Sequence, residues 1–529
     1  MDYKKPWLGF VVGGMAAAIA LTGCTATPSE QPPPAEQGFV LPDESHLTPQ
    51  QGGTLRFGIS GGGLTASNNP NNAIYSSDFV RANALYDKLA DFDDKGRMEP
   101  ALAESFESNA DATEWTIKLR SGVLFQDRSI LDADDVINTW QRILEGKWKG
   151  SNLLTVIDRD KTKAVDDLTV KVVLNRPVAI FPEFLAADGM YILKKGFTDF
   201  QQSNGTGAFD LVSWTPTDRA VLKRKDGYWR GPAFVDTLEI VELTDVKAGA
   251  TALRDGQINV LSDVATEDVK NLSNADGVYI ATQVGAVASN FYMRVDKEPL
   301  DDPNVRRAMK LSIDREGCLN NAAGGVGSVG NDLPGPASEY YASDLPQRTF
   351  DPEAARKLLQ KSGLDEVTVT LTVGPADPVM LACAQVFQQS AKQAGINIEI
   401  KTIPAQDNWN RDAGYLQRDM GMSSYNGTPL VSFIPGFLLS NAHNNDTHLA
   451  DPAFDAKYWE AVGTVDDGKR TALFKDLQHE MWDTGGHIIW GLTGRTFGLT
   501  SNVHGAQSLV SPNPGLTSSK RLDKLWLER

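Results

Sequence analysis

The sequence has few cysteines and histidines, and it has no excess of positive charge. With three cysteines and six histidines in 529 residues, it lacks the clustered ligands of a multi-cysteine zinc or iron–sulfur framework. The 68 acidic and 51 basic residues give a formal charge of −17. This balance argues against a nucleic-acid partner, because phosphate binding depends on clustered Lys and Arg. The length and the hydrophobic fraction of 41% predict a globular protein of two or three packed lobes.

Long hydrophobic runs are also missing, except for one at the N-terminus. Residues 8–21 are apolar or small and follow two lysines, but a stable membrane span takes about 20 apolar residues, so this run suits an export signal. It ends in residues 21–24, Leu-Thr-Gly-Cys, which resemble a bacterial lipobox, where the cysteine is lipidated and the bond before it is cut. Residues 1–23 are therefore predicted as a lipoprotein signal peptide and Cys24 as the lipidated residue. An ordinary signal-peptidase site, with the cysteine incidental, is the alternative.

The residues after the cysteine predict a tether. Residues 24–51 are polar and rich in proline, so they are extended and cannot bury a core. We expect them to hold a folded body outside the cytoplasm, anchored to the cell membrane by the lipid. The folded body begins near residue 52.

Strands and helices alternate along the folded body. Residues 114–120 alternate as a half-buried strand, and residues 132–146 combine acidic capping residues with apolar residues at helical spacing. The clearest run is predicted as helix, strand, helix and strand over residues 351–359, 367–373, 378–394 and 396–400. A strand–helix–strand unit of this length implies a parallel pair with a right-handed crossover. The predicted fold class is α/β with mixed sheets.

Catalytic and metal-binding motifs are missing as well. Neither a Gly-x-Ser-x-Gly elbow nor a Walker loop is present, and the glycines at 61–63 lack the lysine of a phosphate loop. His443 and His448 form the only close histidine pair, in an Asn-rich stretch typical of a solvated loop. We therefore expect no enzyme, no metal site and no cofactor.

Two cysteines are left after lipidation, Cys318 and Cys383. In an exported chain such a pair can form a disulfide. Two buried thiols that pack as small hydrophobic groups are the equal alternative.

Several linked segments carry a resemblance to a known family. They lie in the order 85–89, 98–106, 115–125, 133–136, 205–209, 226–231, 305–309, 313–315 and 351–363. This order resembles the family 5 extracellular solute-binding proteins of ABC importers, the peptide, opine and nickel group. The resemblance covers about residues 52–529.

The resemblance implies a periplasmic-binding-protein fold (class II, similar to cluster C) of two hinged lobes with an inserted subdomain. By analogy, lobe I combines 52–80, 205–300 and 490–529, the subdomain is 81–204, and lobe II is 301–489. The ligand would bind between the lobes and be buried when they close about the hinge. Implied partners are the permease subunits and, through them, the ATPase. We expect a monomer.

The same resemblance suggests where specificity is set. Peptide binders of this family often carry an aromatic residue and then an Asp that pairs with the ligand's ammonium. In residues 419–429, Tyr425 has the aromatic position, but Asn426 or Thr428 is near the place of the Asp. An amide or hydroxyl cannot supply the counter-charge, so free-amine recognition would need another acid, such as Asp446.

Further ligand-binding candidates come from two other stretches. Trp409 could stack on a sugar ring or cover an apolar side chain, and Arg411 could bind a ligand carboxylate. Core or rim packing is the alternative for Trp409 and Tyr425, and a solvated surface position is the alternative for Arg411. Polar residues after the first strand are also expected to line the cleft: Thr65, Ser67, Asn68 and Asn69.

The function predicted from these features is capture of short peptides for an ABC importer. An oligosaccharide or another small polar solute is the alternative ligand, while the shortage of histidine argues against a His-ligated nickel site. A secreted hydrolase and a surface adhesin are the alternatives from other classes.

Overall fold

The computed structural model describes most of the chain after the proline-rich segment. The described residues are 41–60, 63, 66–93, 96–243, 246–336, 338–374, 378–404, 407–426, 429–509 and 521–529. The predicted signal peptide, Cys24, most of the predicted tether, Thr65 and Thr428 lie outside this set. None of the helices within it combines the length and the apolar character needed to cross a membrane.

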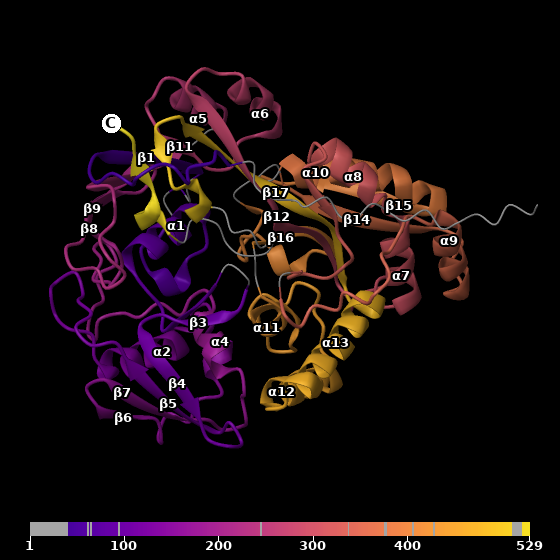
Figure 1. Ribbon diagram of the computed structural model, residues 1–529. Coiled ribbons are helices and arrows are strands. Elements are labelled where there is room, and N and C mark those ends of the chain that lie inside the picture. Colours follow the sequence, from indigo (N-terminus) through magenta and orange to yellow (C-terminus); the bar gives the residue numbers. More distant parts are fainter. Residues whose placement is uncertain are drawn as a thin grey trace, which may run out of the picture. The chain divides into compact units, whose positions relative to one another are not determined.

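One mixed sheet contains eleven strands of the described chain, in the order β15-β14-β16-β12-β17-β11-β1-β10-β9-β8, with β13 paired to β17 (Figure 1). In chain order the strands are β1 (Thr54–Ser60), β8 (Phe209–Thr215), β9 (Arg219–Arg224), β10 (Thr237–Leu243), β11 (Val260–Leu261), β12 (Val278–Met293), β13 (Gly327–Val329), β14 (Val367–Val373), β15 (Ile396–Thr402), β16 (Met420–Asn426) and β17 (His487–Thr500). The α/β class with mixed sheets is confirmed.

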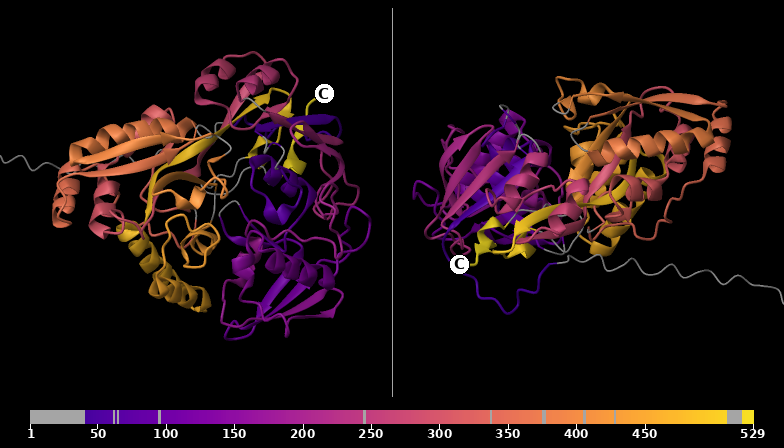
Figure 2. Two further views of the ribbon diagram at one scale, coloured as in Figure 1. Left: turned by 180° about the vertical axis from the view of Figure 1, so that it is seen from behind. Right: turned by 90° about the horizontal axis from the view of Figure 1, so that it is seen from above.

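Two long strands, β12 and β17, connect the two halves of this sheet (Figure 2). The start of β12 and the end of β17 belong to the first half, with β1 and β8–β11, while their other ends belong to the second half, with β13–β16. Their antiparallel register is interrupted between Gln283 and Val287. Gly285, in this interruption, has a φ of +69°, which a residue without a Cβ adopts at little cost. The two halves are thus joined at a local irregularity.

Helices cover both halves of the main sheet. Those of the first half are α1 (Ser76–Leu85), α5 (Val246–Arg254) and α6 (Thr266–Ser273); those of the second half are α7 (Pro303–Ser312), α8 (Arg315–Ala322), α9 (Pro352–Lys361), α10 (Pro378–Ala391), α11 (Leu430–Phe433), α12 (Pro452–Gly463) and α13 (Asp467–Thr484). As predicted, α10 connects β14 to a parallel β15, with Val369 opposite Ile398. The valines of β14 are buried and alternate with threonines, so the hydrophobic pattern fixes the register.

A separate small sheet has the strand order β4-β5-β7-β6. Its elements and neighbours are β2 (Ala90–Phe92), β3 (Met98–Pro100), β4 (Ala103–Ser108), β5 (Glu114–Leu119), α2 (Ala133–Gly146), α3 (Ser151–Leu154), β6 (Lys163–Asp166), β7 (Thr169–Val173) and α4 (Phe181–Ala186). Trp140 of α2 belongs to the same buried cluster as Ile117 and Val170 of the strands. Asp132 caps α2 by accepting a hydrogen bond from Asp135 N at 3.0 Å. The predicted strand and helix are confirmed here.

A buried carboxylate just before β2 connects that segment to the residues next to β8 and β9 of the main sheet. Asp87 accepts hydrogen bonds from Thr206 Oγ1 at 2.9 Å, Tyr228 OH at 2.9 Å and Trp229 Nε1 at 3.1 Å. Burial raises the pKa of Asp87, while Arg230 and these three donors oppose the increase. Three of the segments that carry the family resemblance therefore meet at one side chain.

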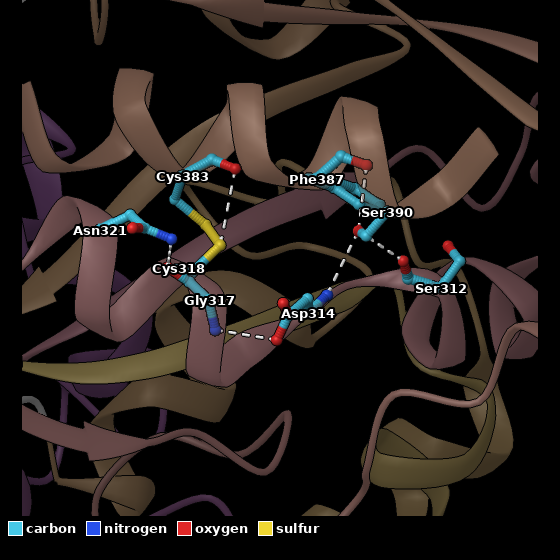
Figure 3. The surroundings of a disulfide bond; sticks show 8 residues. All are labelled: Ser312, Asp314, Gly317, Cys318, Asn321, Cys383, Phe387 and Ser390. Carbon is cyan, nitrogen blue, oxygen red and sulfur yellow. Dashed lines mark hydrogen bonds between the residues drawn. A yellow bond between two sulfur atoms is a disulfide. The ribbon is translucent and has the colours of Figure 1, made fainter. Parts of the chain in front are cut away.

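A disulfide joins α8 to α10. Cys318 and Cys383 are both fully buried, with their sulfur atoms 2.05 Å and their Cα atoms 4.7 Å apart (Figure 3). Beside them, Ser390 Oγ on α10 donates to Ser312 O at 2.8 Å and accepts from Asp314 N at 3.3 Å. The disulfide and these hydrogen bonds attach α10 firmly to the α7–α8 region.

Candidate functional site

The strand directions locate the candidate site at the middle of the main sheet. Gly58 of β1 is aligned, through Leu261 and Gly498, with Ile280 of β12, and β1 runs in the same direction as β12. The carboxyl end of β1 therefore points toward the second half. In β16, which runs the opposite way, Asn426 pairs with Val287.

The carboxyl ends of β1 and β16 therefore approach each other from opposite sides of the interruption in β12. The neighbouring β14 is parallel to β16, so its carboxyl end lies on the same side of the interruption as that of β16. Ligands of open α/β sheets bind outside the carboxyl ends of parallel strands. The loops that follow β1, β14, β15 and β16 are thus the walls of the candidate site.

The first wall is the segment after β1. Asn68 is buried, and its Oδ1 accepts a hydrogen bond from Arg81 Nε on α1 at 2.8 Å. Ser67 N donates to Asp78 Oδ1, also on α1, at 3.1 Å, and Asn69 N donates to Ser67 Oγ at 3.0 Å. The predicted residues Ser67, Asn68 and Asn69 are therefore fixed to one helix. In Asn68, the amide Nδ2 is buried without a hydrogen-bond partner.

Lys149 adds a cation to this wall. Its backbone N donates to Asn71 O at 3.1 Å, which brings the end of α2 against the segment after β1. Its ammonium lies 4.3 Å from the ring centroid of Phe79 and 3.9 Å from the Asp188 carboxylate. Desolvation lowers the pKa of Lys149, and Asp188 only partly offsets this. No motif singled out Lys149, because it reaches the site through a contact between distant parts of the chain.

The second wall is the loop after β15. It carries the predicted Trp409, whose side chain is 40% exposed, and the exposed Arg411. Arg411 Nη1 lies 2.7 Å from His443 Nε2; because a guanidinium only donates, this ring nitrogen is the acceptor. Desolvation and then the charges of Arg411 and Lys149 lower the pKa of His443. His443 thus contacts Arg411 of the second wall.

A direct contact joins α3, which follows the end of α2, to the segment after β16. Asn152 Nδ2 on α3 donates to Pro435 O, and Asn444 N donates to Gly436 O at 3.1 Å. Asn152 follows Lys149 by three residues, and Asn444 directly follows His443, so the segments that carry Lys149 and His443 adjoin. Nearby, α11 also contacts α4 (Figure 1).

Tyr425 lies in the interior of the second half and not on an open wall. Its side chain is 4% exposed, and its ring centroid is 4.8 Å from that of Phe433 and 4.7 Å from that of Phe437. Its hydroxyl accepts from Asn290 Nδ2 at 3.1 Å. The ring is thus used for packing, the alternative that the sequence left open. Asn426 is described only through its backbone pairing with Val287.

Asp446, the acid considered as a replacement for the missing Asp, is fully buried. Its Oδ2 accepts from Tyr415 OH at 3.0 Å and from Tyr425 OH at 3.1 Å, and His487 Nε2 lies 3.0 Å from Oδ1. Desolvation first, and the Asp446 charge second, raise the pKa of both tyrosines. The carboxylate is thus enclosed by its own partners and is not presented to a ligand.

The two close histidines have different partners. His443 contacts Arg411, whereas His448 Nε2 lies 2.7 Å from Leu416 O. In the part of the chain that the structure describes, no three His, Cys, Asp or Glu side chains are arranged to hold a metal ion.

A separate cavity of about 340 Å³ lies between the β2–β3 strand pair and the first half, around Asp87 and Tyr228. Its charged groups form ion pairs with one another, such as Arg230 with Asp91 at 2.9 Å and Arg521 with Asp523 at 2.8 Å. None of the ligand-binding residues predicted from the sequence lines it. The cavity therefore belongs to the junction of the β2–β3 strand pair with the first half.

Comparisons with known proteins agree with this geometry. The family model of the bacterial extracellular solute-binding proteins, family 5 (middle), matches residues 97–447. Over 444 residues the chain is 26% identical to the glutathione-binding protein GsiB of Pectobacterium atrosepticum, covering 80% of this chain and 86% of the relative. Over 446 residues it is 27% identical to the dipeptide-binding protein of Escherichia coli, covering 77% and 83%.

Solved structures share the fold. The binding protein DppA of Helicobacter pylori in complex with the peptide STSA has a TM-score of 0.78 at 21% identity, covering 91% of this chain and 99% of that one. The oligopeptide-binding protein AppA of Bacillus subtilis, in complex with a nonapeptide, has a TM-score of 0.76 at 21% identity, covering 91% and 100%. NikZ of Campylobacter jejuni, in complex with Ni(L-His), has a TM-score of 0.78 at 19% identity, covering 89% and 99%. The expected periplasmic-binding-protein fold is confirmed.

Proposed function

The chain belongs to the family 5 bacterial extracellular solute-binding proteins, and from this premise we propose that it captures short peptides between the two halves of its main sheet. As a member of this family it is the substrate-binding protein of an ABC importer. It is a transport receptor and not an enzyme. The ligand is bound and released without a covalent change.

The observation that carries the proposal is the meeting of two loop walls at the interruption of the two long strands. β1 ends on one side and β14 and β16 end on the other, while β12 and β17 cross between them. Bending at the interruption would open and close the walls around a ligand. Closure removes water, which strengthens the polar contacts to the ligand, and the permease would sense the closed form.

Peptides are the ligand class that the relatives support best. Their printed names include a dipeptide-binding and a glutathione-binding protein, and two of the solved structures hold peptides. Trp409, with 40% of its side chain exposed, offers a face for a ligand side chain. A small polar solute without an ammonium is the second candidate, which the enclosed Asp446 favours.

The proposal includes the domain organisation and the membrane anchor. Lobe I would be 52–80, 205–300 and 490–529, the subdomain 81–204 and lobe II 301–489, on a tether of residues 24–51. Cys24→Ser should leave the precursor without lipid and release the protein from the membrane, because the acyl chains hold the anchor. Membrane fractionation checks this, and normal retention of the variant would contradict the lipobox.

The first experiment is native mass spectrometry of the purified mature chain, 24–529, followed by denaturation and identification of what is released. We expect a mixture of short, uncleaved peptides. A single non-peptide solute would replace peptides by the second candidate. X-ray scattering with and without the released ligand should show a contraction on binding, and unchanged dimensions would contradict closure.

A further inference from the structure

A short strand pair packed on the first half binds an acidic side chain from the segment that precedes β1. The pair consists of β18 (Val503–His504) and β19 (Trp526–Leu527). Glu44 Oε1 lies 3.1 Å from His504 Nδ1, and Glu44 Oε2 accepts a hydrogen bond from Gly505 N at 2.8 Å. Both oxygens of the Glu44 carboxylate therefore have a partner at the end of β18.

The contact between Glu44 and His504 is largely shielded from solvent. Their side chains are 12% and 11% exposed, and the Trp526 ring stacks on the imidazole with the ring centroids 4.4 Å apart. The second ring nitrogen of His504 lies 3.4 Å from Glu528 Oε2. Exposed ion pairs contribute little to stability, whereas a shielded hydrogen bond to a carboxylate is among the stronger ones. The Glu44 contact is of the shielded kind.

The chain around Glu44 is attached to the folded body at a second point. Leu47 N donates to Glu44 O at 2.9 Å, which closes a turn directly after the carboxylate. Before the turn, Leu41 packs against the buried cluster of the first half. The indigo start of the described chain accordingly runs beside the yellow C-terminal segment in Figure 1. Residues 41–47, which belong to the predicted tether, are thus held by one apolar and one polar contact.

We infer that residues 41–47 are a docking segment, bound to the β18–β19 pair through Glu44 and His504, and that they fix the point at which the tether leaves the folded body. Glu44 recognises the surface, since its two oxygens contact two different groups there. The neighbouring acid, Asp43, is exposed. The docking requires no lipid, and only its consequence at the membrane rests on the proposed anchor at Cys24.

Docking shortens the free part of the tether. A chain spans at most ~3.5 Å per residue, so residues 25–40 reach at most ~55 Å, against ~95 Å for residues 25–51. The local concentration of a tethered protein falls as its linker lengthens beyond the span that it must bridge. The docking segment would therefore hold the receptor closer to the permease, and always by the same side of the first half.

The first experiment measures docking by hydrogen exchange and mass spectrometry on the mature chain without lipid, 24–529. We expect Glu44→Ala to speed exchange of the Leu47 and Gly505 amides at least ~10-fold, because the first loses its bound turn and the second its acceptor. Asp43→Ala is the matched control and should exchange as the parent does. Equal exchange in the parent and in Glu44→Ala would overturn the inference.

A variant on the other side of the contact assigns the effect to the strand pair. His504→Ala should also speed exchange in residues 41–47. Because Glu44 and His504 act as one contact, the double variant should exchange no faster than Glu44→Ala alone. Additive effects of the two substitutions would mean that Glu44 is held elsewhere, which contradicts the inference.

A second experiment measures the consequence on the lipidated chain in vesicles. A fluorophore on Ser501→Cys, an exposed position of the first half, transfers energy to an acceptor dye in the bilayer. Glu44→Ala should lower the transfer, since the longer free tether raises the mean distance by ~5–10 Å, whereas Asp43→Ala should not. Unchanged transfer in Glu44→Ala, together with faster hydrogen exchange, would contradict the effect of docking on the reach.

Failure of the docking and failure of the proposed anchor have different signatures. If Cys24 carries no lipid, the anchor and the membrane consequence are both contradicted, while hydrogen exchange on the unlipidated chain still decides the docking. If Cys24 carries lipid and exchange is equal in the parent and in Glu44→Ala, the anchor is supported and the docking is wrong.

Discussion

Two polar clusters in the second half differ in whether their charged side chain is buried among partners or exposed to solvent. Around Asp446, two tyrosine hydroxyls and a histidine surround a fully buried carboxylate. Around Arg411, an exposed guanidinium contacts a histidine, and none of the described ion pairs neutralises it. A buried network that satisfies its own groups fixes one conformation, whereas an exposed cation is free for a ligand. The enclosed cluster is thus expected to govern stability and the exposed cluster binding.

Removing the enclosed carboxylate should have the largest effect. Asp446→Ala removes the carboxylate that accepts hydrogen bonds from two buried hydroxyls and lies beside His487, so we expect a loss of about 3–5 kcal/mol in the free energy of unfolding. Denaturant unfolding measures this, with the exposed Asp476→Asn as control. A loss below about 1 kcal/mol would mean that the cluster does not stabilise the second half.

The disulfide provides a second test of rigidity in the same half. Replacing both Cys318 and Cys383 by Ser should lower the free energy of unfolding by about 2–4 kcal/mol, because the bond restricts the unfolded chain. Ligand affinity should be unchanged, since the bond joins α8 to α10. Unfolding with and without reductant measures the effect. Two thiols titrated in the unfolded, unreduced protein would contradict the disulfide.

A pair of aromatic variants separates the two clusters directly. Trp409→Ala should weaken ligand binding by about 1–3 kcal/mol if its exposed face covers the ligand, with little change in melting temperature. Tyr425→Phe should leave affinity unchanged and lower the free energy of unfolding by about 1–2 kcal/mol, through the lost hydrogen bond to Asp446. Calorimetry on both variants checks this, and exchanged effects would reverse the assignment of the clusters.

A further prediction concerns a carboxyl on α4, at its contact with Tyr340. Tyr340 OH donates to Glu183 Oε1 at 3.3 Å, and burial, together with the charge of Glu339, raises the pKa of Glu183 from 4.5 to about 8, against Arg470. Because the folded state binds the proton more tightly than the unfolded state, its stabilising contribution is present below the unfolded pKa and is lost as the pH rises through 8.

The matched variant for this carboxyl is Glu183→Gln. The melting temperature of the parent should fall between pH 5 and 8 more steeply than that of Glu183→Gln, whereas the exposed Glu107→Gln should follow the parent. Identical pH profiles of the parent and Glu183→Gln would contradict protonation of Glu183 in the folded state.

Much of the fold could be predicted because its signals are local. Alternating valines and threonines predict β14, and the following helix and strand predict the parallel pair that α10 connects. The order of the family segments predicts the two-part fold, and three of those segments meet at Asp87. The candidate site was predicted less well. The sequence indicates which residues belong to each loop, but it does not show which loops contact one another in the folded chain.

The sequence by itself determined the α/β class and the family, and it singled out Trp409 and Arg411 as candidates, which lie in the loop after β15. Only the tertiary structure decided that His443 contacts Arg411, that Asp446 is enclosed, and that Cys318 is bonded to Cys383. The sequence could not show these contacts because they join residues that are far apart along the chain. Periodicity reports which face of one element is buried, but charge compensation and burial at a site depend on contacts between elements that are far apart in sequence.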